Sequence, residues 1–168
     1  MDSPANPAPS GRATLRIGND YSELNRVAVW LAQSAAGFGL SDSLVFRLDL
    51  VLNEALSNII GYAHPEAGTH EIAILLNDHP DRVLLEITDA GIPFDPFARE
   101  PFVEAESLAQ ATVTGRGIHL IRSFTDEQKY RRLENGNTIR LTLYKSNRAT
   151  RPATSDQPSP PLATDPAQ

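Results

Sequence analysis

Apolar residues at helical spacing predict two consecutive helices in the first half of the chain. Between residues 20 and 39 they recur every three or four positions, and Asp20 and Glu23 stand at the spacing of a capping box. The expected inward stripe of this helix is Leu24, Val27, Ala28, Leu31 and Ala35. Ser41 is expected to cap a second, longer helix that Pro65 would end. Its expected buried stripe is Val51, Leu52, Ala55, Leu56, Ile59 and Ile60.

Shorter apolar runs predict strands, which are residues 13–19, 70–77, 82–89, 127–134 and 137–145. The sequence DHPD joins the second and third runs, and Asn135-Gly136 joins the last two, so two hairpins are expected. A loop from Gly91 to about Thr114 precedes a short helix at residues 117–124. The order β, α, α, β, β, loop, α, β, β favours an α+β fold. We expect a two-layer α/β sandwich, with a mixed, largely antiparallel sheet and its helices on one face.

The distribution of proline limits the folded unit to the middle of the chain. The chain has 168 residues, of which 40% are hydrophobic and 21% charged, as in one soluble globular domain. Three of its 13 prolines fall in residues 1–12 and five in residues 146–168, among small and polar residues. Such segments bury too little apolar surface to offset chain entropy. We therefore expect disordered tails at 1–12 and 146–168 and one folded domain at 13–145.

Charge and cysteine content narrow the class of protein. The formal net charge of −6 argues against sequence-independent binding to nucleic acid, which needs clustered Lys and Arg. The absence of cysteine excludes disulfides and cysteine metal ligands. No apolar stretch reaches the roughly 18 residues of a membrane span, and the first residues lack the features of a signal peptide. A cytoplasmic protein without direct contact to membrane or nucleic acid is expected.

Two groups of residues interrupt the apolar pattern. Glu54 and Asn58 stand four residues apart, and thus on one face of the second helix, where the simplest explanation is a solvent-exposed edge. Asp89 ends an apolar strand and is followed by Gly91 and Pro93, which is also a common strand-to-turn sequence. Glutamate and asparagine oxygens suit Mg²⁺ and can orient a nucleophile. An aspartate at a strand end can accept a hydrogen bond from a purine amine, with a glycine beside it to admit the base.

A third segment adds an anion site to this set. Gly115 and Gly117 flank Arg116 immediately before the short predicted helix. Free backbone N–H groups and the helix dipole favour an anion at such a position, although a plain loop would explain a single pair of glycines. The three segments together, in this order, indicate a site for a nucleotide with its metal ion.

The segments NEALSNIIGYAHP, TDAGIPFDP and GRGIHLIRS resemble the N, G1 and G2 boxes of the GHKL ATPase superfamily. The resemblance extends over residues 13–145 and is strongest to the small anti-sigma factor serine/threonine kinases of the RsbW type. It implies a Bergerat-type ATPase fold that binds ATP and Mg²⁺. Glu54 would be the general base that activates the attacking hydroxyl, and Asn58 would bind the Mg²⁺ that bridges the ATP phosphates.

The resemblance also assigns the remaining nucleotide contacts. Asp89 would bind the adenine amino group, Gly91 would lie beneath the base, and Pro93 belongs to the same box. The phosphate end would be lined by Gly115, Arg116 and Gly117. Thr138 would complete the adenine pocket through a water molecule.

The activity implied by the resemblance is that of a kinase and a partner switch. The protein would hold a sigma factor and phosphorylate a small STAS-type antagonist, and it is expected to form a homodimer. Two alternatives remain: a nucleotide-binding protein that sequesters its partner without turnover, and an ATPase adaptor for a partner other than a sigma factor. The scattered histidines lack a phosphoacceptor context, which disfavours a complete histidine kinase.

Overall fold

The computed structural model describes residues 10–63, 70–98 and 113–146. Its elements follow the predicted order, with a 3-10 turn η1 before the first helix and a π-helical turn η2 after the second. The helical elements are η1 (Tyr21–Glu23), α1 (Leu24–Phe38), α2 (Asp42–Asn58), η2 (Ile59–Ala63) and α3 (Val113–Phe124). The strands are β1 (Gly11–Gly18), β2 (Glu71–Asp78), β3 (Arg82–Asp89), β4 (Glu127–Leu133) and β5 (Gly136–Tyr144).

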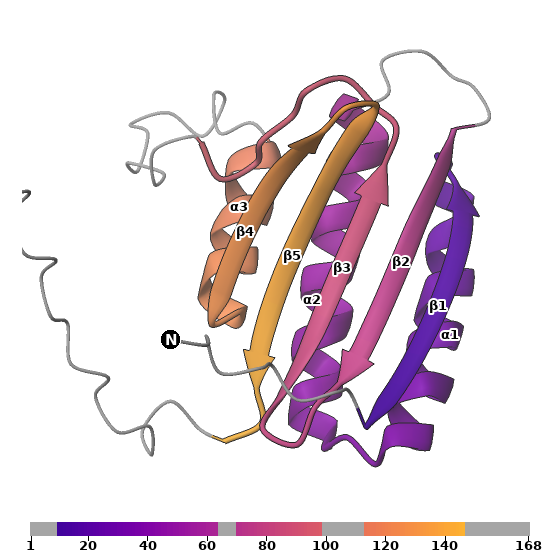
Figure 1. Ribbon diagram of the computed structural model, residues 1–168, viewed down its shortest axis with the longest axis vertical. Coiled ribbons are helices and arrows are strands. Elements are labelled where there is room, and N and C mark those ends of the chain that lie inside the picture. The colour runs from indigo at the N-terminus through magenta and orange to yellow at the C-terminus, as the bar shows by residue number, and fades with distance from the viewer. Residues whose placement is uncertain (1–9, 64–69, 99–112, 147–168) are drawn as a thin grey trace, which may run out of the picture.

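The strands form one sheet in the order β1-β2-β3-β5-β4, and every neighbouring pair is antiparallel. All three helices lie behind this sheet (Figure 1). The prediction of a two-layer α+β sandwich with helices on one face is therefore confirmed. The sheet differs from the prediction in one respect: no parallel pair occurs among the described strands, because hairpins build both halves of the sheet.

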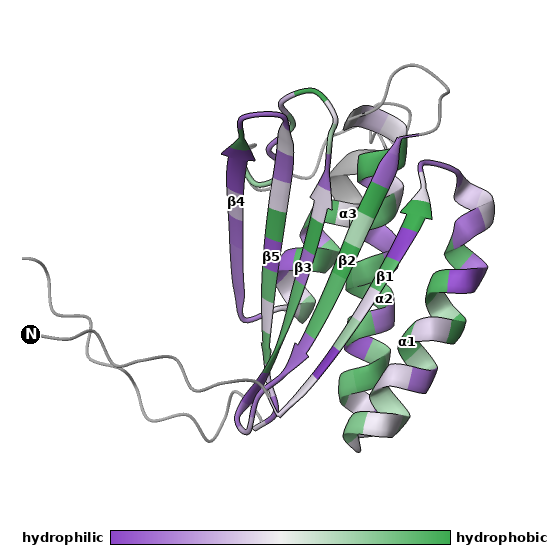
Figure 2. Cartoon of the chain, turned by 45° about the vertical axis from the view of Figure 1, so that its right-hand side comes forward, coloured by the Kyte–Doolittle hydropathy of each residue, from purple (hydrophilic) through white to green (hydrophobic). Residues whose placement is uncertain are grey.

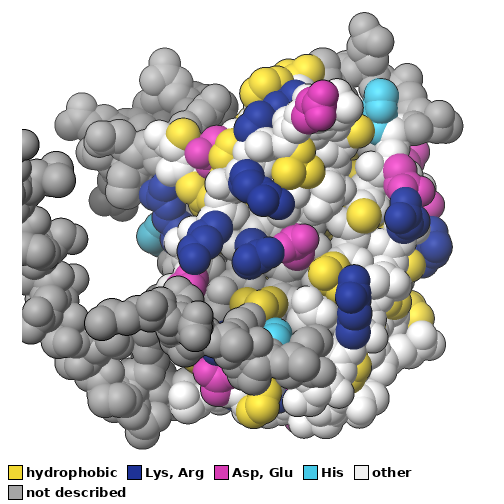
Figure 3. Space-filling model, in the orientation of Figure 1, with side chains coloured by type: hydrophobic (Ala, Val, Ile, Leu, Met, Phe, Trp, Pro, Cys, Tyr) yellow, Lys and Arg dark blue, Asp and Glu magenta, His cyan; other side chains and the backbone are white. Residues whose placement is uncertain are grey.

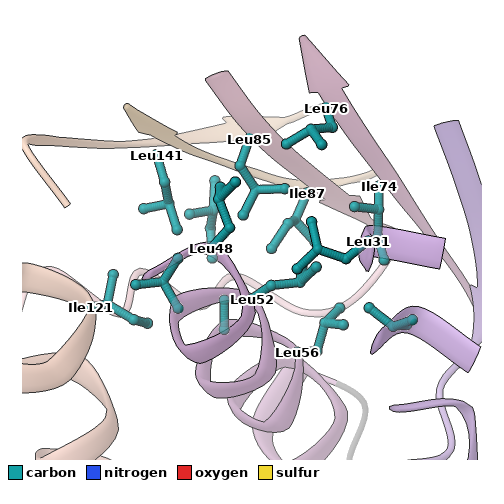
Figure 4. Close-up of a cluster of buried hydrophobic side chains, with 14 of the residues drawn as sticks. Leu31, Leu48, Leu52, Leu56, Ile74, Leu76, Leu85, Ile87, Ile121 and Leu141 are labelled. Atoms are coloured by element: carbon teal, nitrogen blue, oxygen red, sulfur yellow. The ribbon is translucent and has the colours of Figure 1, made fainter. Parts of the chain in front are cut away.

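The core lies between α2 and the centre of the sheet. Leu48, Leu52 and Leu56 point from α2 toward side chains of the central strands, among them Leu85 and Leu141 (Figure 4). Full burial of one such side chain contributes roughly 1.5–3 kcal/mol relative to exposure. Every second residue of β2 and β3 is buried, and hydrophobic residues also fill several of the half-buried positions between them, as the long green stretch of β2 shows (Figure 2). No helix in the described ranges is both long and apolar enough to cross a membrane.

The other face of the sheet carries no helix and gathers basic side chains (Figure 3). Lys129 and Arg131 of β4 and Arg140 of β5 line a shallow depression there. Arg140 is paired with Glu86 of β3 at 2.7 Å, which partly neutralises this surface. The sheet thus has one apolar face that packs on the helices and an outer face on which charged side chains stand beside Ala73, Leu75 and Leu84.

The buried stripe predicted for the second helix, which the structure divides into α2 and η2, is confirmed, since all six of its residues are buried. The stripe predicted for α1 is wrong at Ala28, which is exposed, and Leu24 is only half-buried. Val27, Leu31 and Ala35 are buried as expected. The reason is the position of α1 behind the edge strand β1, where it presents a narrower face to the core than the central helix does (Figure 1).

Side-chain caps stand at the starts of η1 and α2. The Asp20 carboxylate accepts a hydrogen bond from Ser22 N at 2.7 Å and so caps η1, ahead of α1. This backbone hydrogen bond, with a contribution from the Ser22 side chain, lowers the pKa of Asp20 below its usual 3.8. Ser41 Oγ accepts from Leu44 N at 3.4 Å at the start of α2, as predicted. The predicted end of that helix at Pro65 lies outside the described residues.

The starts of β1 and α3 differ from their predicted positions. The strand β1 begins at Gly11, which pairs with Asp78, so it takes two residues from the segment predicted as a tail. The helix α3 begins at Val113, four residues before the predicted start. Apart from Ser10 and Ser146, the rest of both predicted tails lies outside the described residues, as do residues 99–112 of the predicted loop.

Candidate functional site

Four secondary-structure elements begin or end close together at one edge of the sandwich, the edge at which β3 ends and β5 begins (Figure 1). Near this edge α2 and β3 end, and α3 and β5 begin (Figure 1). The three segments singled out in the sequence belong to these ends. The antiparallel hairpins and the helix order therefore bring together residues that are far apart in the chain.

Glu54 and Asn58 of α2 face the first turns of α3. A Cβ atom on Gly117 would stand 2.5 Å from Glu54 Oε2 and 3.5 Å from Asn58 Nδ2. The absence of a side chain at Gly117 thus lets α3 rest on both polar groups. Asn58 is only 5% exposed, and its Nδ2 atom has no hydrogen-bond partner among the described residues. A solvent-exposed edge therefore does not explain Asn58, and a buried, unpaired amide is a group that a ligand could engage.

Gly115 and Gly117 both lie inside α3. The predicted start at residue 117 was wrong, since the helix begins at Val113. Glycine in a helix interior costs only about 1 kcal/mol, and at Gly117 it also permits the close approach to Glu54. The side-chain surroundings of Arg116 lie outside what the structure describes. Farther along α3, Arg122 donates to the carbonyl of Phe97 at 2.8 Å and ties the helix to the segment after β3.

Asp89 ends β3 on the helix-facing side of the sheet and is 4% exposed. Its Oδ1 atom accepts hydrogen bonds from Gly91 N at 2.7 Å and from Asn137 Nδ2 at 3.0 Å. The bond from Gly91 shows that the turn explanation for this segment also holds. The second bond gives the carboxylate a partner on β5 that turn formation does not need, so its orientation is set by two elements.

Asn137 was missed in the sequence. It pairs with Asp89 in the β3–β5 register and is 1% exposed. The available signal was the Asn135-Gly136 turn, from which the register of β5 against β4 could have been counted. The strands β3 and β5 are not adjacent in the sequence, so no turn between them indicates how they pair. Gly136 packs so closely on Asp89 that a Cβ atom there would collide with the Asp89 carbonyl oxygen.

Thr138 does not lie beside Asp89 and Asn137. Residues alternate between the two faces along a strand, so Thr138 points away from the face that carries Asp89 and Asn137. Its hydroxyl lies 3.1 Å from that of Thr88, and the residue lines the depression on the basic outer face. The role expected for Thr138 in an adenine pocket is therefore not supported by its position.

The loop after β3 touches the end of α2. Gly91 is buried, whereas Pro93 is exposed. The rings of Phe94 and Tyr62 stack with centroids 5.7 Å apart and an interplanar angle of 10°. Because Tyr62 follows Asn58 by one helical turn, this stack joins the Asp89 loop to the helix that carries Glu54 and Asn58.

The donor set fits Mg²⁺ only if phosphate oxygens complete it. Asn58 Oδ1 and the Glu54 carboxylate offer oxygen ligands, which hard cations prefer, whereas the buried, unpaired Nδ2 of Asn58 is a donor that suits a phosphate oxygen. Within the described ranges no group of three or more acidic or histidine side chains could hold a metal ion alone. The protein part of such a site would be Asn58, with Glu54 beside it.

The family of this fold follows from comparison with known proteins. Residues 17–143 match the model of the histidine kinase-like ATPase domain family, so the chain belongs to that family. The match includes every residue of the candidate site, and it confirms the superfamily inferred from the three boxes.

Individual relatives are protein kinases by name. The chain is 32% identical over 133 residues to serine/threonine-protein kinase BtrW of Bordetella bronchiseptica. The alignment covers 79% of this chain and 94% of that protein. It is 25% identical over 129 residues to serine-protein kinase RsbW of Listeria innocua, covering 74% and 80% of the two chains. Identity to RsbW of Bacillus subtilis is 23% over 122 residues, covering 70% and 76%.

Among solved structures, the histidine kinase domain of the Erythrobacter litoralis EL346 blue-light activated histidine kinase aligns with a TM-score of 0.45 at 13% identity. The alignment covers 71% of this chain and 61% of that one.

Proposed function

We propose that this protein is an ATP-dependent serine/threonine protein kinase and an anti-sigma factor, which phosphorylates a STAS-type antagonist in a partner-switching system. The observation that carries the proposal is the contact of Gly117 with the Glu54 carboxylate and the buried amide of Asn58. The names of the relatives, serine and serine/threonine kinases, support transfer to a protein hydroxyl.

Glu54 is the general base in this proposal. Its half-buried carboxylate accepts the proton of the attacking Ser or Thr hydroxyl while the new oxygen–phosphorus bond forms and the bond from the γ-phosphorus to the β,γ-bridging oxygen breaks. The products are ADP and the phosphorylated antagonist. Asn58 would hold Mg²⁺, which neutralises charge on the phosphates. Positioning and charge stabilisation supply most of the catalysis in such transfers.

The other residues bind the nucleotide. Asp89 accepts a hydrogen bond from the adenine amino group, while Gly91 and Pro93 form the adjoining turn. Gly115, Arg116 and Gly117 lie at the phosphate end, where α3 begins to cover α2. Gly115 lies in the first turn of α3, where backbone N–H groups have no partner within the helix and can bind phosphate, whereas the N–H of Gly117 would become free only if the start of the helix unwound.

Phosphorylation would act as the switch between partners. The added phosphate carries a charge of about −1.5 to −2 and would weaken the complex with the antagonist by disturbing its interface. The kinase, released from the antagonist, would then hold the sigma factor away from RNA polymerase. A homodimer in the cytoplasm, where ATP and the sigma factor occur, completes the proposal.

The test is phosphate transfer from radiolabelled ATP with Mg²⁺ to a STAS-domain protein. Three proteins are compared: the unmodified chain, Glu54→Gln, and the control Glu86→Gln. Glu86 lies on the outer face of the sheet, paired with Arg140, so its substitution leaves the site untouched. The proposal predicts labelled antagonist with the unmodified chain and the control, and a loss of about 10²–10⁴ in rate for Glu54→Gln.

Two results would contradict the proposal in different ways. Binding of ATP without transfer to any antagonist would favour a protein that sequesters its partner without turnover. Equal transfer by Glu54→Gln and the unmodified chain would show that Glu54 is not the base.

A further inference from the structure

The side chain of Asn137 makes hydrogen bonds at both of its polar atoms. Nδ2 donates to Asp89 Oδ1 at 3.0 Å and to the carbonyl of Ile92 at 2.8 Å. Oδ1 accepts from the Tyr130 hydroxyl at 2.8 Å and from Arg132 at 3.1 Å. Because the acceptors lie on one side of the amide and the donors on the other, only one orientation of the amide satisfies them all.

The backbone of Asn137 is held as firmly as its side chain. It lies in β5 between two antiparallel neighbours, opposite Asp89 on one side and Arg132 on the other. Gly136 packs directly against the Asp89 carbonyl and sets the separation of the two strands at this point. The sheet therefore places the amide before any ligand arrives, which is the condition for preorganised recognition.

We infer that Asn137 is a positioning residue that aims the Asp89 carboxylate at the amino group of adenine. The inference rests on the proposed function, since it assumes a nucleotide at this edge. A carboxylate can rotate about its χ2 angle, and a single bond from Gly91 N would leave that rotation partly free. The second bond, from Asn137, fixes the plane of the carboxylate and with it the direction in which the group can accept.

The same residue shapes the floor of the site. Its bond to the Ile92 carbonyl and a longer one from Phe94 N to its Oδ1, at 3.4 Å, hold the turn that follows Asp89. Arg132 adds a bond to the Gly91 carbonyl at 2.8 Å. Asn137 thus connects the Asp89 carboxylate, which would accept a hydrogen bond from adenine, to the backbone on which adenine would rest.

The test compares the affinity for ATP with that for purine riboside triphosphate, which lacks only the amino group. Equilibrium dissociation constants are measured for the unmodified chain, Asn137→Ala and Asn137→Asp. The aspartate variant keeps the size and the acceptor atoms but lacks both donors. Asn77→Ala is the control: it makes the same change on the same sheet, near the opposite end of the strand pair from Asp89.

The ratio of the two dissociation constants is the decisive quantity. The unmodified chain and the control are expected to prefer ATP by about tenfold or more, as a hydrogen bond to a charged group provides. Both Asn137 variants are expected to lose that preference while binding purine riboside triphosphate at most a fewfold more weakly. A purely structural role would weaken both nucleotides equally and leave the ratio unchanged, which would overturn the inference.

The remaining outcomes are equally informative. If the unmodified chain binds neither nucleotide, the proposed function itself fails. If it prefers ATP and the Asn137 variants keep that preference, only the role of Asn137 fails. Loss of the folded state in both variants, seen by circular dichroism, would also overturn the inference, because the sheet would then depend on Asn137 for its stability.

Discussion

Gly117 is the residue through which α3 contacts the proposed base. A Cβ atom at this position would stand 2.5 Å from Glu54 Oε2, which is the far end of a flexible side chain. In Gly117→Ala the carboxylate is therefore expected to move while the helices stay in place. The gain in helix propensity, up to about 1 kcal/mol, offsets the contact. We predict a melting temperature near that of the unmodified chain and a phosphoryl-transfer rate at least about tenfold lower.

The matched control for this prediction is Gly37→Ala. Gly37 also lies within a helix, α1, and nothing stands within 4 Å of its Cβ position. It should gain a little stability and keep its full rate. Equal rates for the two variants would show that the position of the Glu54 carboxylate does not matter.

Gly136 stands against backbone, and backbone cannot move aside as a side chain can. In Gly136→Ala the new Cβ would collide with the Asp89 carbonyl. The β3–β5 pair must then separate near its end, so the free energy of unfolding should fall by roughly 1–3 kcal/mol in a denaturant titration. Gly18→Ala, whose Cβ position is open, should change it by less than about 0.5 kcal/mol. Similar losses for both variants would contradict the close approach.

Only part of the candidate site could be read from individual residues. Glu54 and Asn58 were visible because two polar groups at helical spacing interrupt an apolar stripe, and Asp89 because it ends a strand before a glycine. Asn137 carried no such mark, since its role depends on the pairing of β5 with β3. Thr138 stands one position beyond Asn137, and the period of two along a strand places its side chain on the opposite face of the sheet.

Arg47 of α2 fastens the far end of α3 to the sheet. It donates to the carbonyl of Phe124 and to the carboxylate of Asp126, both at 3.0 Å, and Asp126 in turn accepts from Tyr144 N at 2.8 Å. Asp126 has a side-chain exposure of 3%, so removal of its partner leaves a buried charge less well compensated. In Arg47→Ala the free energy of unfolding is predicted to fall by about 2–4 kcal/mol.

An exposed pair provides the comparison for Arg47. Arg26 is paired with Glu23 at 2.9 Å on the surface of α1, with 57% of its side chain exposed. Arg26→Ala should cost at most about 0.5 kcal/mol in the same denaturant titration. If both arginines gave the same small change, Arg47 would not be a structural clamp.

Element order was predictable because each element has its own local signal. The hairpin turns and the buried stripe of α2 marked their elements directly. The start of α3 was not predictable, because glycine signals the end or the absence of a helix in most contexts. Its tolerance within α3 comes from the packing of Gly117 on α2, which is a tertiary contact.

In the two-layer architecture, side chains between the layers contribute more to the free energy of unfolding than side chains on the outer face of the sheet. Leu56 of α2 is fully buried between the layers, whereas Leu75 of β2 is only half-buried and points to the outer face. Leu56→Ala is predicted to lower the free energy of unfolding by about 2–5 kcal/mol, and Leu75→Ala by about 1 kcal/mol. Equal losses measured by denaturant titration would mean that another surface covers the outer face.

Net charge alone gave an incomplete picture of the surface. The value of −6 correctly describes the chain as acidic, yet Lys129, Arg131 and Arg140 gather on the outer face of the sheet (Figure 3). Their clustering follows from the period of two along paired strands, which places every second residue of β4 and β5 on the same side. It could be inferred from the sequence only once strand order was known.

The most direct test of a nucleotide site at this edge is equilibrium titration of the protein with ATP and Mg²⁺, for the unmodified chain and for Asp89→Asn. The substitution keeps the size of the side chain but removes its charge and one acceptor. Saturable binding by the unmodified chain, weakened about tenfold or more in Asp89→Asn, is the predicted result. Absence of binding at millimolar ATP, or equal affinity in the two proteins, would contradict the assignment of this edge as an adenine nucleotide site.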